Sequence, residues 1–235
     1  MKTEKTKTYD DRTINSPNIF ARYSHRKRIA NVLRQVSKRL DFGKILDYGC
    51  GSGVLISELN EMKANCAIGY EPFLSAWHGH KEGLPIYVDY ADVLANAPYA
   101  TITILEVLEH VGWDKMSNVF DNFRELLTPD GIVIVSVPIE IGPAVLLKHF
   151  NRLRYDKGQH VGIHDNFLEL ISAAFFGAVG YRDPLKGSHK NFDFRHLIKF
   201  AKSRDWQIKI LGYSPIPIIG WYGNSQVMFT MERQE

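Results

Sequence analysis

The sequence contains little cysteine and no long apolar run. Its two cysteines, Cys50 and Cys66, are too few for a disulfide framework and lack the C-x-x-C spacing of a metal site. No stretch approaches the roughly 18 consecutive apolar residues of a membrane span, and residues 1–5 lack the apolar centre of a signal peptide. We therefore expect a cytoplasmic protein without a membrane span.

Strong charge of either sign is also missing. The formal net charge is +3 over 235 residues, so the composition neither demands nor excludes an anionic partner. A hydrophobic content of 45% is ordinary for a globular protein, and the length suits one sizeable α/β domain. We expect a flexible tail over residues 1–16 and a single domain over residues 17–235.

The most informative stretch is residues 44–55, where a short apolar strand ends and glycines alternate before a helix. Gly49, Gly51 and Gly53 give the pattern G-x-G-x-G, whereas a dinucleotide fingerprint needs its third glycine or alanine at the position of Val54. A backbone without side chains at a strand-to-helix turn lets a ligand approach closely. Because Asp47 would repel a pyrophosphate, the turn favours a ligand with positive charge.

Strand and helix patterns alternate over most of the chain, which predicts a doubly wound α/β sheet with right-handed crossovers. After residues 45–48, we expect six further strands, at residues 65–72, 84–90, 100–105, 132–138, 206–213 and 226–231. Helical patterns cover residues 18–40, 54–59, 73–81 and 114–127, the last one ending at a turn over 128–131. The 11 residues before the seventh strand hold no helical pattern and are too few for a parallel crossover. Six parallel strands and an antiparallel last strand are therefore expected.

The alternation stops between about residues 139 and 190. Residues 143–154 and 164–176 have helical patterns, with Asp165 as the expected N-cap of the second helix, and Asp193 is expected to cap a later helix. The segment is rich in aromatic and small residues. It is suited to be a lid over the site or a contact between two copies of the chain.

Two features have alternative interpretations. Glu71 ends the second expected strand, where an acid can accept hydrogen bonds from ribose hydroxyls, or it is a simple loop carboxylate. The first helix has a basic face, which is either a solvated surface or a patch that steers an anionic substrate such as RNA.

Five segments together resemble class I S-adenosylmethionine-dependent methyltransferases. They are I-L-D-Y-G-C-G-S-G at 45–53, G-Y-E at 69–71, L-E-V-L-E-H-V at 105–111, L-L-T-P-D-G at 126–131 and the antiparallel last strand. The resemblance implies that Asp47 and the turn containing Cys50 hold the methionine part of the cofactor. It further implies that Glu71 binds the ribose and that Leu105 passes under the cofactor. Asp89 would accept from the adenine amine beside Tyr90, with Asp92 as its rival.

The sequence Glu106-x-x-Glu109-His110 is nearest to the metal-binding motif of ubiquinone-pathway O-methyltransferases and of small-RNA terminal 2′-O-methyltransferases. By this resemblance, the two glutamates and the histidine would hold Mg²⁺ or Mn²⁺, ions that suit carboxylates with one imidazole. Without a metal, His110 beside Glu109 would be the general base. A further ligand would come from the insertion, which offers His160, His164 and His189.

These resemblances imply O-methylation of a small hydroxylated acceptor such as a sugar, glycan, phenol or biosynthetic intermediate. The insertion matches neither of the two metal-dependent groups, so the identity of their acceptors does not carry over. An RNA 2′-O-methyltransferase is an alternative, which the modest charge and the lack of an appended RNA-binding module disfavour. A catalytically silent, cofactor-binding subunit is the other alternative.

Overall fold

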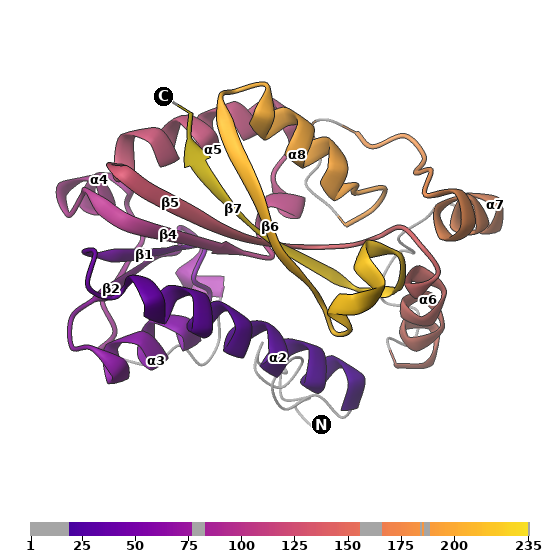
Figure 1. Ribbon diagram of the computed structural model, residues 1–235, viewed down its shortest axis with the longest axis horizontal. Helices are drawn as coiled ribbons and strands as arrows, with labels where there is room; N and C mark the ends of the chain where they lie inside the picture. The colour runs from indigo at the N-terminus through magenta and orange to yellow at the C-terminus, as the bar shows by residue number, and fades with distance from the viewer. Residues whose placement is uncertain (1–18, 77–82, 156–165, 184, 186–188, 235) are drawn as a thin grey trace, which may run out of the picture. The chain divides into compact units, whose positions relative to one another are not determined.

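Four short parallel strands make up the first part of the sheet. In the computed structural model, which describes residues 19–76, 83–155, 166–183, 185 and 189–234, they are β1 (Ile45–Tyr48), β2 (Ala67–Tyr70), β3 (Ile86–Tyr87) and β4 (Tyr99–Leu105). β1 pairs in parallel with β2 and β4, and β2 pairs in parallel with β3. Two helical segments precede β1, α2 (Ile19–Val36) and η1 (Ser37–Arg39), and α3 (Val54–Met62), η2 (Leu74–Ala76) and α4 (Tyr90–Ala95) lie between the strands; Figure 1 labels α2, α3 and α4.

The later strands form an antiparallel group. They are β5 (Leu127–Pro138), β6 (Trp206–Ser214) and β7 (Gln226–Arg233), and β7 pairs antiparallel with both β5 and β6. The helices α5 (Trp113–Leu126) and α8 (Phe194–Lys202) meet β6 through aromatic rings. The ring of Phe120 lies 5.3 Å from that of Phe200 and 6.2 Å from that of Trp206, centroid to centroid. All three elements therefore share one core.

The strand order confirms the expected fold class. The seven strands are ordered β3-β2-β1-β4-β5-β7-β6, with six strands in one direction and the last strand opposite to them. The chain divides into two compact units, Met1–Thr103 and Ile104–Glu235, and the boundary between them lies inside β4. The expected tail over residues 1–16 lies outside the described residues, and the single domain over 17–235 stays a prediction.

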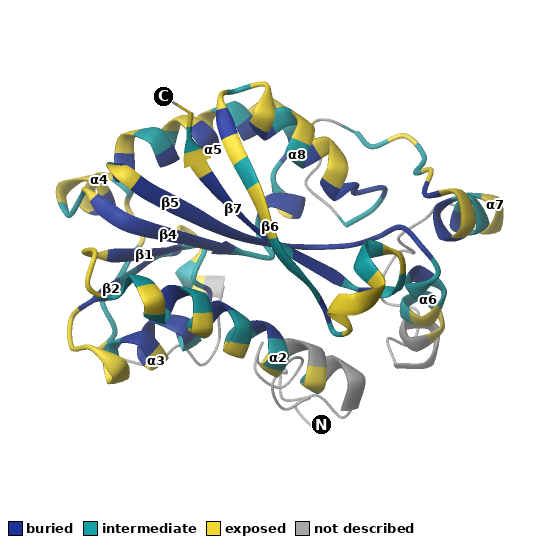
Figure 2. Cartoon of the chain, in the orientation of Figure 1, coloured by how far each residue is buried: buried dark blue, intermediate teal, exposed yellow. Residues whose placement is uncertain are grey.

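Burial follows the strands. Figure 2 shows β4, β5 and β7 mostly in the colour of buried residues, as expected for strands with neighbours on both sides. In β5 the whole run from Ile132 to Pro138 is buried. None of the described helices is long and apolar enough to cross a bilayer.

The insertion after β5 contains α6 (Ala144–Tyr155), α7 (Phe167–Ile171) and a π-helical turn, η4 (Ser172–Phe176). Val145, Leu170 and Ala174 form a small buried cluster of their own. The two helical predictions are confirmed, but the N-cap is Asn166, whose side chain accepts from the Glu169 N–H, and not Asp165. Several large apolar side chains of the insertion are exposed: Leu147, Phe150, Phe167, Leu168, Phe175 and Phe176.

Two further predictions about elements were wrong. The third strand was expected to reach residue 90, but β3 ends at Tyr87 and residues 90–95 form α4. This helix begins because the Asp89 carboxylate accepts a hydrogen bond from the Ala91 N–H. The link before β7 holds a 3₁₀ turn, η5 (Pro217–Gly223), where no helix was expected. Asn224 stabilises this turn, because its buried amide bonds the backbone of Ile216 and Gly220. The predicted cap of α8 by Asp193 is confirmed.

The expected turn at residues 128–131 lies within β5, which begins earlier than predicted, at Leu127. A Cβ atom added to Gly131 would lie 2.9 Å from the Thr128 carbonyl oxygen, three residues earlier. An extended chain would separate these positions by roughly 10 Å. The backbone therefore turns between Thr128 and Gly131, and β5 includes this turn.

We predict that Gly69→Ala destabilises the protein by about 1–3 kcal/mol through overpacking. An added Cβ in β2 would lie 2.3 Å from Ile56 Cδ1 and 2.5 Å from Cys50 Sγ. Ile56→Val deletes Cδ1, so the double variant should lose less stability than the sum of the two single changes. Denaturant unfolding measures all three free energies, and strict additivity would contradict the steric explanation.

Candidate functional site

The glycine turn between β1 and α3 has a backbone that side chains would disfavour. Gly49, Gly51 and Gly53 have φ angles of 79°, 55° and 81°, in the left-handed region. A Cβ on Gly53 would also lie 2.7 Å from Leu84 Cδ1 and 2.9 Å from Ile86 Cδ1. The third glycine therefore lets the start of α3 pack against the residues at and before β3.

Asp47 lies in β1, two residues before this turn, and is only 4% exposed. The Thr103 hydroxyl donates to Asp47 Oδ1 over 2.7 Å. Burial raises the pKa of Asp47 to about 7, with a smaller contribution from the negative charge of Glu71, whereas the Thr103 hydrogen bond opposes the rise. A bound positive charge would stabilise the ionised form of this buried carboxylate.

Glu71 follows β2 and is also buried. Its Oε2 accepts from the Gly51 N–H and its Oε1 accepts from the Phe73 N–H, each over 3.1 Å. The Glu71 N–H in turn donates to the Tyr87 carbonyl at the end of β3. Two buried carboxylates thus converge on the glycine turn, and each Glu71 oxygen keeps a second lone pair for a hydroxyl donor.

The other expected cofactor residues lie after β3. Asp89 is exposed and caps α4, and Tyr90 is the first residue of that helix. The Tyr90 ring lies 6.2 Å from the Tyr70 ring, which lies 4.9 Å from the Tyr48 ring. Tyr90 was expected here, whereas Tyr48 and Tyr70 were missed, although they are the last residues of β1 and β2. It supplies aromatic faces beside the two buried acids.

Cys50 packs inside the turn. A Cβ added to Gly69 would lie 2.5 Å from its sulfur, and burial raises the pKa of the Cys50 thiol above its usual range. The thiol therefore stays neutral and fills space, while the backbone of residue 50 belongs to the turn.

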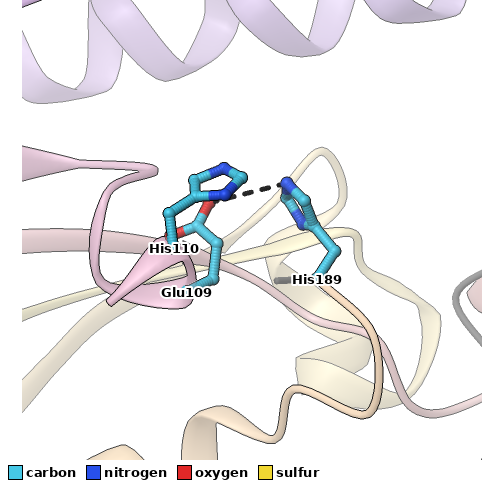
Figure 3. Close-up of side chains that lie close together, drawn as sticks. All are labelled: Glu109, His110 and His189. Atoms are coloured by element: carbon cyan, nitrogen blue, oxygen red, sulfur yellow. Dashed lines mark ion pairs between the residues drawn. The ribbon is translucent and has the colours of Figure 1, made fainter. Parts of the chain in front are cut away.

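A second cluster lies in the later unit of the chain. The 3₁₀ turn η3 (Leu108–His110) buries Glu109 completely and leaves His110 exposed. His189, at the end of the insertion, places Nε2 4.0 Å from Glu109 Oε1 (Figure 3). Glu109, His110 and His189 each offer one ligand atom, and these atoms lie within 4.8 Å of one another. The structure thus brings His189 to two of the expected metal ligands.

The imidazole of His110 favours its neutral form. Although the residue as a whole is exposed, partial desolvation of its imidazole lowers the pKa of His110, and the neighbouring His189 and Arg182 lower it further, whereas Glu106 raises it. The His110 and His189 rings meet edge to face with centroids 4.7 Å apart. A neutral imidazole is the form that accepts a proton or binds a metal ion.

The remaining expected site residues are placed differently. Glu106 has a φ angle of 56° and its Oε1 accepts from the Ser136 hydroxyl, so it is not one of the three clustered residues. Leu105 ends β4 and is half-buried. His160 and His164 lie outside the described residues.

Sequence reasoning missed Arg182. Its Nη2 donates to the Glu109 carbonyl over 2.7 Å, and a longer contact of 3.5 Å reaches the Val111 carbonyl. The guanidinium lies 4.9 Å from the Phe192 ring and 5.8 Å from the Trp113 ring. Burial lowers the pKa of Arg182, and the Glu109 charge opposes this shift. Arg182 therefore fixes the backbone of η3, which no local motif indicated.

One comparison with known proteins shows the family of the chain. A family model described as a methyltransferase domain matches residues 20–178. No curated protein matches the chain. Three solved structures of similar fold are each less than 25% identical to this chain in sequence, so they bear on the fold alone.

A SAM-dependent methyltransferase from Archaeoglobus fulgidus is 11% identical with a TM-score of 0.57, over 96% of this chain and 98% of that one. The plantazolicin methyltransferase BpumL, in complex with a triazolic desmethylPZN analog and SAH, is 12% identical with a TM-score of 0.56, over 97% and 88%. Magnesium protoporphyrin IX methyltransferase from Synechocystis PCC 6803 with bound SAH is 15% identical with a TM-score of 0.51, over 93% and 89%.

We predict that Asp47 makes the ligand-free protein less stable as pH rises from about 4 to 7. The folded state holds the Asp47 proton up to about pH 7, while the unfolded chain releases it near 3.8. Across that window the folded state binds more protons, so this residue lowers the free energy of unfolding by up to about 1 kcal/mol per pH unit. Asp47→Asn should remove this fall, which unfolding at pH 5 and pH 8 measures. Equal pH dependence in both proteins would contradict it.

Proposed function

Because the chain belongs to the methyltransferase domain family, we propose that it transfers the methyl group of S-adenosylmethionine to a hydroxyl of a small acceptor. The observation that carries the cofactor assignment is the pair of buried acids, Asp47 and Glu71, at the glycine turn. The sulfonium and ammonium of this cofactor are cationic, so they would offset the cost of burying both carboxylates.

We assign each part of the cofactor to a group among the described residues. Asp47 would bind the methionine amine, Glu71 the ribose hydroxyls, and Asp89 with Tyr90 the adenine. Structures of similar fold were solved with SAH bound, which supports the same cofactor here. Leu105 is proposed to line the cofactor, as the resemblance to class I enzymes implies.

Methyl transfer breaks the carbon–sulfur bond of the sulfonium and forms a carbon–oxygen bond to the acceptor. The acceptor hydroxyl must lose its proton, and the cluster of Glu109, His110 and His189 supports that step. Without a bound metal ion, His110, held neutral, would accept the proton. Arg182 would keep Glu109 and His110 in place through the backbone of η3.

The same cluster is suited to a divalent cation. One carboxylate and two imidazoles within 4.8 Å form a mixed oxygen and nitrogen donor set. Imidazole nitrogens disfavour Mg²⁺ relative to transition ions, so of the two expected ions we propose Mn²⁺. A bound cation would lower the pKa of the acceptor hydroxyl, with Glu109, His110 and His189 as its ligands.

Two of the basic side chains on which the RNA alternative rests belong to the fold, although Arg26, Arg34 and Lys38 are exposed. Arg28 in α2 is only 8% exposed, and Arg39 in η1 donates to the Thr101 hydroxyl and the Ala100 carbonyl. These side chains support the fold of the first unit. Binding to RNA at low salt that falls steeply with added salt would restore the alternative.

The partner proposals rest on the exposed apolar side chains of the insertion. Phe176 and Leu168 are 80% and 79% exposed, which supports a contact with a second copy of the chain or with the acceptor. The substrates named for similar structures, a porphyrin and a plantazolicin analog, belong to those proteins. They illustrate how much the acceptor varies on this fold.

Calorimetry should detect binding of S-adenosylmethionine to the wild-type protein. At pH 6 binding should release a proton, because Asp47 with a pKa of about 7 must ionise to pair with the cofactor amine. Asp47→Asn should weaken binding about 10- to 100-fold, as expected for a lost charge-assisted hydrogen bond, and should abolish the proton release. Titrations in two buffers of different ionisation enthalpy measure both quantities. Unchanged affinity in the variant would refute the cofactor site.

Methyl transfer should depend on Mn²⁺. In a screen of phenolic, glycan, lipid-precursor and RNA acceptors, chelator treatment and Glu109→Gln should each lower turnover roughly 100-fold or more. Binding of S-adenosylmethionine should stay intact in both cases. Glu125→Gln, on the exposed face of α5, is the matched control. Full turnover in chelator would exclude the ion and leave His110 as the base, whereas no turnover on any acceptor despite cofactor binding would favour a silent subunit.

A further inference from the structure

Glu140 is a carboxylate in an unusual place. It follows the end of β5 and is 1% exposed, between Ile139 and Ile141, which are both fully buried. Burying an ionised carboxylate costs several kcal/mol unless other groups compensate it. No catalytic motif in the sequence includes this position, so its partners must explain it.

Two side chains approach the two oxygens of Glu140. Lys148 Nζ lies 3.3 Å from Oε2, and His189 Nδ1 lies 3.4 Å from Oε1. The Lys148 ammonium also donates to the carbonyls of Ile139 and Ser225. Lys148 therefore provides both the compensating charge and a fixed position for the carboxylate.

The two nitrogens of His189 lie near different acids. Nδ1 is shielded from solvent and lies 3.4 Å from Glu140 Oε1, an ion-pair distance without hydrogen-bond geometry, while Nε2 lies 4.0 Å from Glu109 Oε1. A carboxylate on one side of an imidazole holds the proton on that nitrogen and leaves a lone pair on the other. Since that lone pair would point to the cluster of Glu109 and His110, the arrangement matches a ligand held by an outer carboxylate.

The backbone around Glu140 is fixed at both sides. The Ile139 N–H donates to the Ser225 carbonyl, and the Gly142 N–H donates to the Ala173 carbonyl. A Cβ on Gly142 would lie 2.7 Å from the Tyr222 carbonyl oxygen, so the chain is closely packed there. The backbone that carries Glu140 is therefore held in one position, as a residue that positions another side chain requires.

We propose that Glu140 is a positioning residue for His189, and that Lys148 neutralises it. Glu140 keeps His189 in the tautomer with hydrogen on Nδ1, so that Nε2 is directed toward Glu109 and His110 as an acceptor. The metal part of this inference rests on the proposed function of that cluster. The tautomer part depends only on the chain's own residues.

The first test measures binding of Mn²⁺ alone to the full-length protein by electron paramagnetic resonance. Glu140→Gln should raise the Kd for Mn²⁺ roughly 10- to 100-fold, Glu140→Asp should restore part of the loss, and Glu125→Gln should bind like wild type. S-adenosylmethionine affinity should be equal in all four proteins, which shows that they are folded. If Glu140→Gln binds Mn²⁺ like wild type, the role of Glu140 is overturned while the proposed function stands.

The second test reads the tautomer of His189 by long-range nitrogen–proton correlation spectra of metal-free protein. His189→Gln identifies the signal among the nine histidines. Hydrogen on Nδ1 in the wild type, and loss of this preference in Glu140→Gln, support the proposal. Hydrogen on Nε2 in the wild type overturns it. If wild type binds no Mn²⁺, the ion in the proposed function fails, and this measurement still decides the role of Glu140.

Discussion

Buried carboxylates are the constraint on which both candidate sites depend. Asp47, Glu71, Glu109 and Glu140 are each less than 7% exposed, and the cost of burying a charge must be offset locally. Backbone N–H groups hold Glu71, a threonine hydroxyl holds Asp47, and an ammonium lies beside Glu140. These partners fix each acid in one geometry, and the positive charge of a ligand can supply what they leave uncompensated.

The glycine turn shows how packing and ligand binding place the same demand on the chain. Gly51 donates its N–H to Glu71 from a left-handed conformation, so the conformation of the turn also orients the acid. Because Gly69 has no side chain, the Cys50 side chain can pack closely against β2. A side chain at either glycine would disturb the acid and the turn together, because a single set of contacts supports both.

The sequence predicted what local patterns encode and missed what distant segments supply. The seven strands, the turn and the acids Asp47 and Glu71 lie in contiguous motifs, so their placement followed from the order of strands. Glu140 and Arg182 act through contacts with residues far along the chain, and no periodicity marks such contacts. The helix α4 was missed because the Asp89 cap was read as a strand end, and η5 because two prolines masked a turn that Asn224 stabilises.

The placement of His189 changes the chemistry expected of the second cluster. The motif Glu106-x-x-Glu109-His110 alone offers two carboxylates and one imidazole, a set that suits a hard cation such as Mg²⁺. In the structure Glu106 accepts a hydrogen bond from the Ser136 hydroxyl, and His189 lies with Glu109 and His110 in its place. The donor set thus gains an imidazole, which favours a transition ion over Mg²⁺. His189 comes from the end of the insertion, so the insertion as well as the motif after β4 would contribute to the choice of the ion.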